Sequence, residues 1–199
     1  MTPTASIVIA SYNSIRDLNL FLFGERWCHN SIYRDGAITY GLLKRRYVEA
    51  DKKTWEPIYE FVIPSTISEI DYEIIVVDNA STDGSRGLLR RLGEDKKITY
   101  IHNSRNEGYA KALNQGIKAA KSDLIIASNA DMEVVRPDWL EWILRCWEEP
   151  PKPCIMGQQL AWTKYDVPYI GRMPYLSGHL LIFDKKSIQE LGGFDEEFF

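Results

Sequence analysis

Short apolar segments that end in polar clusters recur along this chain, with helix-like segments between them. Tyr72–Val77 is apolar on both faces, which is typical of a central parallel strand buried within a sheet. Apolar residues at Ala110, Leu113, Ile117 and Ala120 follow the spacing of one helix face. The expected strands are Ser6–Ala10, Tyr72–Val77, Ile98–Ile101, Leu124–Ser128 and Gly178–Phe183. This alternation predicts an α/β fold, an open, mixed and mostly parallel sheet with helices on both faces.

Length and composition predict one globular domain over residues 1–199. The chain has 24 Lys and Arg against 28 Asp and Glu, a net charge of −4, which gives no general attraction to nucleic acid. Its apolar segments are much shorter than the roughly 18 residues of a membrane span, and no signal peptide is recognisable. Three cysteines without a C-x-x-C pair fit a reducing compartment. We therefore expect a soluble, cytoplasmic protein, with peripheral contact to a membrane left open.

One segment, about residues 21–68 (Phe21–Ser68), does not follow the alternation. It mixes Trp and Tyr residues with a run of Lys and Arg residues. Aromatic and basic residues gather where a protein binds an acceptor or a membrane surface, which is one interpretation. The more ordinary interpretation is an additional helix on the sheet with an exposed basic face, because charged runs are commonly such faces. The segment is expected to be an insertion into the domain.

Polar side chains follow three of the expected strands. They lie in Ala10–Asn13, Asp78–Asp83 and Asn129–Asp131. Ligands of open α/β sheets bind at the carboxyl ends of the strands, so these clusters predict one polar ligand site. Tyr12 is suited to stack on a nucleobase, and Asp78 to accept hydrogen bonds from a base or ribose. Asp131 is suited to hold a divalent cation that neutralises phosphate charge.

Each of these side chains also has a structural interpretation. Asp78 and Asp83 would cap the following helix, Asn106 is a suitable N-cap, and Tyr12 is an ordinary turn aromatic. Motifs of rival nucleotide proteins are absent from the sequence: it contains no G-x-G-x-x-G and no G-x-x-x-x-G-K-[ST]. It also has no G-x-S-x-G. These absences argue against a dinucleotide dehydrogenase, a P-loop NTPase and the simplest hydrolases.

Five motifs follow one another along the chain. They are S-I-V-I-A-S-Y-N, Y-E-I-I-V-V-D-N-A-S-T-D-G-S, N-E-G-Y-A-K-A-L-N-Q-G-I, S-N-A-D and L-G-G-F-D-E-E-F-F. Their content and order resemble the family 2 glycosyltransferases. The resemblance implies a single GT-A-like, Rossmann-type domain that transfers a sugar, with inversion, from a nucleoside-diphosphate sugar to a hydroxyl acceptor. It also implies a divalent cation, Mg²⁺ or Mn²⁺, and a glycan, lipid or protein as acceptor.

The resemblance also implies individual site residues. Contacts to the nucleotide and donor are expected from Ala10, Tyr12, Asn13, Asp78, Asn106, Gly108, Lys111, Asn114, Asn129 and Ala130. Asp131 matches the last acid of the family's D-x-D metal motif, and Ser177-Gly178 resembles a turn near the donor sugar. An amide binds a hard cation more weakly than a carboxylate does. Because Asn129 replaces the first acid of the motif, metal binding is expected to depend on the donor pyrophosphate.

The catalytic base of the family belongs to an E-D pair beyond G-G-F-D-E-x-F-F, whereas this sequence ends at Phe199. Asp195 and Glu196 are the acids nearest the expected place, and Asp195 is the candidate base, with capping of a final turn as its structural alternative. A nucleotide-sugar-binding fragment or degenerate homologue without transferase activity is therefore an alternative function. A sugar-phosphate nucleotidyltransferase is disfavoured because no Gly-rich, Arg-containing loop follows the first strand.

Overall fold

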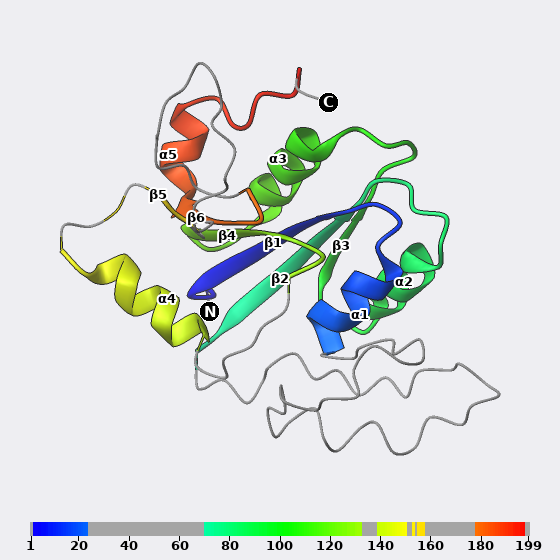
Figure 1. Cartoon of the computed structure of the whole chain (residues 1–199), viewed down its shortest axis with the longest axis horizontal. Helices are drawn as coiled ribbons and strands as arrows, with labels where there is room; N and C mark the ends of the chain where they lie inside the picture. The colour runs from blue at the N-terminus through cyan, green and yellow to red at the C-terminus, as the bar shows by residue number, and fades with distance from the viewer. Residues whose placement is uncertain are drawn as a thin grey trace, which may run out of the picture.

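A computed structural model shows a six-stranded mixed sheet with the strand order β3-β2-β1-β4-β6-β5 (Figure 1). The structure describes residues 2–23, 70–132, 139–150, 153, 155–157 and 178–197. The strands are β1 (Ala5–Ser11), β2 (Tyr72–Asp78), β3 (Thr99–His102), β4 (Leu124–Asn129), β5 (Ile155–Gly157) and β6 (Leu180–Asp184). The first four are parallel, and β6 runs antiparallel to both β4 and β5. The expected α/β fold with a mostly parallel sheet is confirmed.

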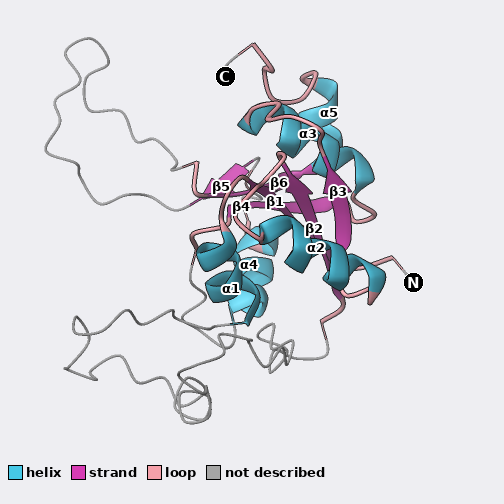
Figure 2. Cartoon of the chain, turned by 90° about the vertical axis from the view of Figure 1, so that its right-hand side faces the viewer, coloured by secondary structure: helices cyan, strands magenta, loops and turns pink. Residues whose placement is uncertain are grey.

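Helices cover both faces of this sheet (Figure 2). One face carries α1 (Ile15–Phe23), α2 (Ser85–Glu94) and α4 (Trp139–Glu148). The other face carries α3 (Tyr109–Ala119) and α5 (Lys185–Glu190). In the described part of the chain, none of the helices combines the length and the apolar character that crossing a membrane requires.

The two core layers follow from the alternation of side chains along β1. Ile7 and Ile9 point toward α1 and α2, whereas Val8 points toward α3, because successive strand residues face opposite sides. On the α3 side, a Cβ atom at Gly116 would collide with the Val8 side chain. Glycine at this position therefore lets α3 lie directly against the sheet, which fixes the height of the whole helix above it.

Several boundaries differ from the sequence-based expectation. The strand expected from Gly178 begins at Leu180, and two further differences concern Ile98 and Phe21. Ile98 was expected to begin a strand, but it packs into the core, and β3 starts at Thr99, which pairs with Ile75. Phe21 was expected to belong to the irregular segment, but Phe21 and Leu22 are buried residues of α1. Residues 24–68, the rest of that segment, lie outside the described residues, and both interpretations of the segment remain predictions.

Candidate functional site

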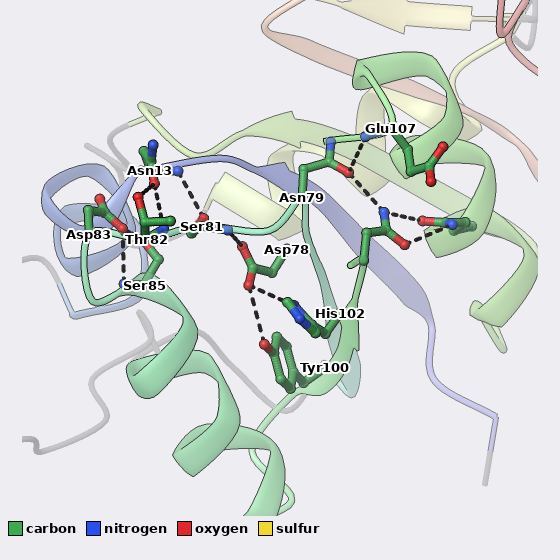
Figure 3. A network of polar contacts seen from close by, with 12 residues as sticks. Asn13, Asp78, Asn79, Ser81, Thr82, Asp83, Ser85, Tyr100, His102 and Glu107 are labelled. Atoms are coloured by element: carbon green, nitrogen blue, oxygen red, sulfur yellow. Dashed lines mark hydrogen bonds and ion pairs between the residues drawn. The ribbon is translucent and has the colours of Figure 1, made fainter. Parts of the chain in front are cut away.

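The polar strand ends that the sequence singled out meet at one edge of the sheet. Parallel pairing places Ser11 opposite Asp78, and Ala10 lies between Val77 and Asn129. The loops after β1, β2 and β4 therefore share the carboxyl edge, where ligands of open α/β sheets bind. Figure 3 shows the hydrogen-bonded part of this edge, from Asn13 to Glu107.

Asn13 ties the loop after β1 to the loop after β2. Its Oδ1 accepts hydrogen bonds from the backbone N–H of Thr82 at 2.7 Å and from the Thr82 hydroxyl at 3.3 Å (Figure 3). Its own N–H donates to Ser81 Oγ at 2.9 Å, and its φ of 49° places it in the left-handed region, which asparagine tolerates. The neighbouring Tyr12 is 50% exposed, so its ring is accessible to a ligand at this edge.

Asp83 joins two helices across the same edge. One carboxylate oxygen accepts from the N–H of Ile15 at 2.9 Å, at the start of α1, and the other accepts from the N–H and hydroxyl of Ser85. Partial burial by itself would raise the pKa of Asp83, but the hydrogen bonds from Ser85 and Ile15 lower it overall. The capping interpretation of Asp83 is correct only in part. Gly84 is the N-cap residue of α2, and Asp83, one residue before it, accepts from the N–H of Ser85 and from the N–H of Ile15 at the start of α1.

Asp78 is fully buried, and both of its oxygens are engaged within the protein. Oδ1 accepts from the N–H of Ser81 at 3.0 Å, while Oδ2 lies 3.3 Å from the Tyr100 hydroxyl and 3.1 Å from His102 Nδ1 (Figure 3). Burial and the nearby Asp78 charge raise the pKa of Tyr100 to about 12. The expected contact between Asp78 and a nucleobase stays a prediction, and Asp78 demonstrably organises the end of β2.

Tyr100 and His102 were not identified from the sequence. The sequence does contain one indication of them: they are two residues apart on an expected strand, and such residues share a face of the sheet. His102 pairs with Asp78 in the register of β2 and β3, so a polar pair at these positions faces the same way as the Asp78 carboxylate. Their contact with Asp78 follows from the pairing of β2 with β3, and this pairing cannot be deduced from the sequence alone.

A network of side-chain amides holds the loop before α3 against the end of β2. Asn79 donates to Gly108 O at 3.0 Å and accepts from Asn103 at 2.8 Å, and Asn103 and Gln115 exchange two further hydrogen bonds. The expected capping role of Asn106 is wrong in its detail: Gly108, with φ 87°, is the N-cap residue of α3. Asn106 instead accepts from the N–H of Gly108 at 3.0 Å, which shapes the loop.

Lys111, an expected donor contact, forms an ion pair in this structure. Its ammonium lies 2.8 Å from Glu107, whose other oxygen accepts from Arg105 at 2.8 Å. The Arg105 guanidinium and the Lys111 ammonium lower the pKa of Glu107 to about 2. Binding of a phosphate by Lys111 would therefore compete with an existing carboxylate partner.

The segment beyond α5 carries the expected catalytic residue, Asp195, and contacts Asn114, another expected donor contact. Asn114 bonds to the backbone of Phe194 and to the Glu196 carboxylate. The Asp195 side chain is exposed, and its Oδ1 accepts from the N–H of Glu197 at 2.9 Å. The turn-capping alternative for Asp195 is thus observed, and its role as a base remains a prediction.

Asp131 follows β4 as an exposed carboxylate, next to the half-buried Asn129 and the buried Ala130. Within the described ranges it has no hydrogen bond or ion pair, and these ranges contain no group of three or more His, Cys, Asp or Glu residues suited to a metal. Tyr109 borders the same place: its hydroxyl donates to Gly178 O at 3.2 Å, and burial and the Asp131 charge raise its pKa. Ser177 lies outside the described residues.

These features fit a divalent cation that takes only part of its coordination from the protein. Asp131 offers hard oxygen atoms that no described side chain occupies, and Asn129 adds an amide nearby. Mg²⁺ in proteins is commonly bound by one or two carboxylates together with substrate phosphates. The residues that are present therefore suit a cation that arrives with, or is completed by, a diphosphate.

An open mixed sheet with polar loops at its carboxyl edge defines the class, a GT-A-like α/β domain. Solved structures with the same fold include the mannosyltransferase PcManGT from Pyrobaculum calidifontis, at 18% identity and a TM-score of 0.63 over 99% of this chain. S. aureus TarS 1-349 has 13% identity and a TM-score of 0.60 over 99% of this chain. The family model described as "Glycosyl transferase family 2" matches residues 56–193. The chain belongs to glycosyl transferase family 2.

Its relatives are longer proteins. The poly-beta-1,6-N-acetyl-D-glucosamine synthase of Staphylococcus aureus is 24% identical over 146 residues, which cover 63% of this chain and 35% of the synthase. The aligned regions make up 49% of the PcManGT chain and 51% of the TarS chain. The chain thus spans about half the length of these two solved structures and about a third of the synthase.

Proposed function

We propose that this chain transfers a sugar from a nucleoside-diphosphate sugar to a hydroxyl acceptor, with inversion and with the help of a divalent cation. The observation that carries the proposal is the exposed Asp131 just after β4, at the same sheet edge as the polar ends of β1 and β2. Family membership and the names of similar proteins support it. PcManGT was solved with GDP-Man and Mn²⁺, and TarS was solved with UDP and with UDP-GlcNAc.

Different residues at the carboxyl edge bind different parts of the donor. The exposed ring of Tyr12 stacks on the base, and the cluster around Asp78 borders that base. Asp131 would hold the cation, and Asn129, two residues earlier at the end of β4, would add an amide oxygen. Lys111, on the first turn of α3, exchanges Glu107 for a donor phosphate. A bound Mg²⁺ or Mn²⁺ supplies charge neutralisation for the departing diphosphate.

Transfer then requires one proton to move. A carboxylate accepts the proton of the acceptor hydroxyl while that oxygen forms a bond to the anomeric carbon and the bond to the diphosphate breaks. Attack opposite the leaving group inverts the configuration at this carbon. Asp195 is the candidate base, and Glu196 is the acid next to it. We place the reaction in the cytoplasm, with peripheral contact to a membrane possible when the acceptor is a lipid.

The experiment compares Asp131→Asn with Asp123→Asn, a control at the opposite end of the same strand. Calorimetry with GDP and UDP, with and without Mn²⁺, is expected to show metal-enhanced binding in the wild type and the control. Losing a hydrogen-bonded charge costs about 1.5–3 kcal/mol, so the metal-dependent affinity of Asp131→Asn should fall about tenfold to a hundredfold. Tight Mn²⁺ binding without nucleotide that Asp131→Asn leaves unchanged would contradict the site.

Turnover separates the proposed transferase from the alternatives. With GDP-mannose or UDP-N-acetylglucosamine as donor, a transferase releases GDP or UDP. A nucleotidyltransferase running in reverse consumes pyrophosphate instead, and a binding protein releases nothing. Binding of the nucleotide without release of any product would favour the nucleotide-sugar-binding alternative.

A further inference from the structure

The segment that follows α5 is hydrogen-bonded to α3 by the side chain of Asn114. Asn114 Nδ2 donates to Phe194 O at 2.8 Å and to Glu196 Oε1 at 2.8 Å, and Asn114 Oδ1 accepts from the N–H of Phe194 at 2.8 Å. The carboxamide thus uses its donors and its acceptor on this segment. A donor-sugar contact by the same atoms would have to replace one of these hydrogen bonds.

Gly193 makes this close approach possible. Its φ is +88°, a region that glycine enters without strain, and a Cβ there would lie 2.8 Å from Asn114 Oδ1. The backbone is held on its other side as well, because the N–H of Gly193 donates to Ile188 O at 2.9 Å. The Phe194 ring packs edge-on against Phe183 of β6, with centroids 5.9 Å apart. The path of the segment is therefore fixed from three directions.

The two acids of the segment are held very differently. Glu196 receives a hydrogen bond from α3, whereas Asp195 bonds only to the N–H of Glu197 among the contacts of the described residues. A glutamate without such a contact would sample several side-chain rotamers. Asn114 thus selects one orientation of the Glu196 carboxylate, and it does so without adding a charge.

The helix that carries Asn114 is itself fixed relative to the candidate site. Gly108, at the start of α3, is bonded to Asn79 at the end of β2. Further along α3, Gly116 lies directly against Val8 of β1. Asn114 lies between these two anchors, so the position of Glu196 is tied to the carboxyl edge of the sheet by one rigid element.

We propose that Asn114 is a positioning residue that acts through Glu196. It holds the Glu196 carboxylate and the backbone of Phe194 in the arrangement that the transfer step uses, and it does not bind the donor. This inference rests on the proposed sugar transfer. It replaces the expected role of Asn114 in donor binding, and it makes turnover depend on the orientation of Glu196, the acid next to the candidate base Asp195.

A double-mutant cycle tests the assignment with Asn114→Ala, Glu196→Gln and the double variant. The assay is release of GDP or UDP from GDP-mannose or UDP-N-acetylglucosamine, with water as acceptor. Misplacing a catalytic element by about 1 Å can cost about a hundredfold, so Asn114→Ala should lower kcat about tenfold to a hundredfold. Calorimetric affinity for GDP or UDP should change less than about twofold, because ground-state binding is not involved.

The cycle also measures whether the two residues act together. If Asn114 works through Glu196, the double variant should be no slower than the slower single variant. Asn114→Asp keeps the acceptor for the Phe194 N–H but places a second carboxylate beside Glu196, so it should be at least as slow as Asn114→Ala. Lys118→Ala, on an exposed position of α3, is the control and should behave as wild type.

Hydrogen exchange of residues 192–197 provides the readout that does not depend on activity. Asn114→Ala should increase exchange there while α3 keeps its protection and the melting temperature stays near that of Lys118→Ala.

An unchanged kcat in Asn114→Ala, additive effects in the cycle, or a large loss of nucleotide affinity would overturn the inference. A wild type that binds no GDP or UDP and releases neither would contradict the proposed function itself. In that case, equal exchange in wild type and Asn114→Ala would overturn the positioning role separately.

Discussion

Two strand ends at the same edge carry an aspartate each and use it in opposite ways. At the end of β2, Asp78 is fully buried and accepts from the Ser81 N–H while lying close to Tyr100 and His102. Just after β4, Asp131 is exposed and has no hydrogen bond or ion pair among the described residues. A carboxylate with occupied acceptors stabilises its loop, and one with open acceptors is available to a ligand. The difference separates the part of the candidate site that is bonded within the protein from the part that is open to a ligand.

The largest expected effect on stability comes from Asp78→Ala. The N–H of Ser81, a buried residue, would lose its acceptor. Leaving such a group unsatisfied costs about 1–3 kcal/mol, so the free energy of unfolding should fall by about that amount in urea titrations. Asp78→Asn keeps an acceptor oxygen and should lose less. Equal stability of Asp78→Ala and wild type would show that Asp78 does not stabilise the end of β2, and the contrast with Asp131 after β4 would be lost.

A smaller effect is expected from Asp83→Ala, which removes the cap of α1 and the contact to Ser85. Loss of a helix cap typically costs about 1 kcal/mol. Hydrogen bonds lower the pKa of Asp83 below its usual 3.8. The contribution of Asp83 to the free energy of unfolding is therefore fully present above about pH 3.8, and it is lost as the pH falls through the lowered pKa. Urea titrations from pH 6 down to pH 3 should therefore show a weaker pH dependence in Asp83→Ala. The same slope in both proteins would contradict this assignment.

The smallest effect on stability is expected from Asp131→Asn. Surface substitutions away from special contacts change stability by less than about 0.5 kcal/mol. The urea midpoint should therefore match wild type, although the same variant is expected to lose metal-dependent nucleotide binding. A clearly destabilised Asp131→Asn would mean that Asp131 also belongs to the part that is bonded within the protein, and the contrast between the two strand ends would disappear.

The strand ends could be predicted from the sequence because apolar strands and polar turns differ so sharply in composition. Tyr72–Val77 was placed correctly as a strand, and the parallel pairing then brought Asp78 and Asn129 to one edge. Which aspartate would be buried could not be read from the same pattern. The burial of Asp78 depends on Tyr100 and His102, whose approach is set by the register of β2 and β3.

Side-chain contacts between residues far apart in the chain could not be predicted from the sequence either. Nothing in the local pattern around Asn114 indicates a contact 80 residues away at Phe194. The same holds for Asp83, which caps α1 from 68 residues further along the chain. Such contacts depend on how the helices lie on the sheet, and this depends on close approaches between distant residues, such as that of Gly116 to Val8.

The antiparallel pairing of β5 and β6 has a consequence for how such a domain diversifies. Gly157 at the end of β5 and Leu180 at the start of β6 both lie at the carboxyl edge, because Gly157 pairs with Leu181 and Leu180 pairs with Ser128. The chain between them therefore leaves and re-enters the sheet beside the candidate site. When such a domain diversifies, a change in this connection begins and ends at two anchor points that the sheet fixes. A substitution that disturbs either anchor pair, Leu180 with Ser128 or Gly157 with Leu181, would also displace this edge of the sheet.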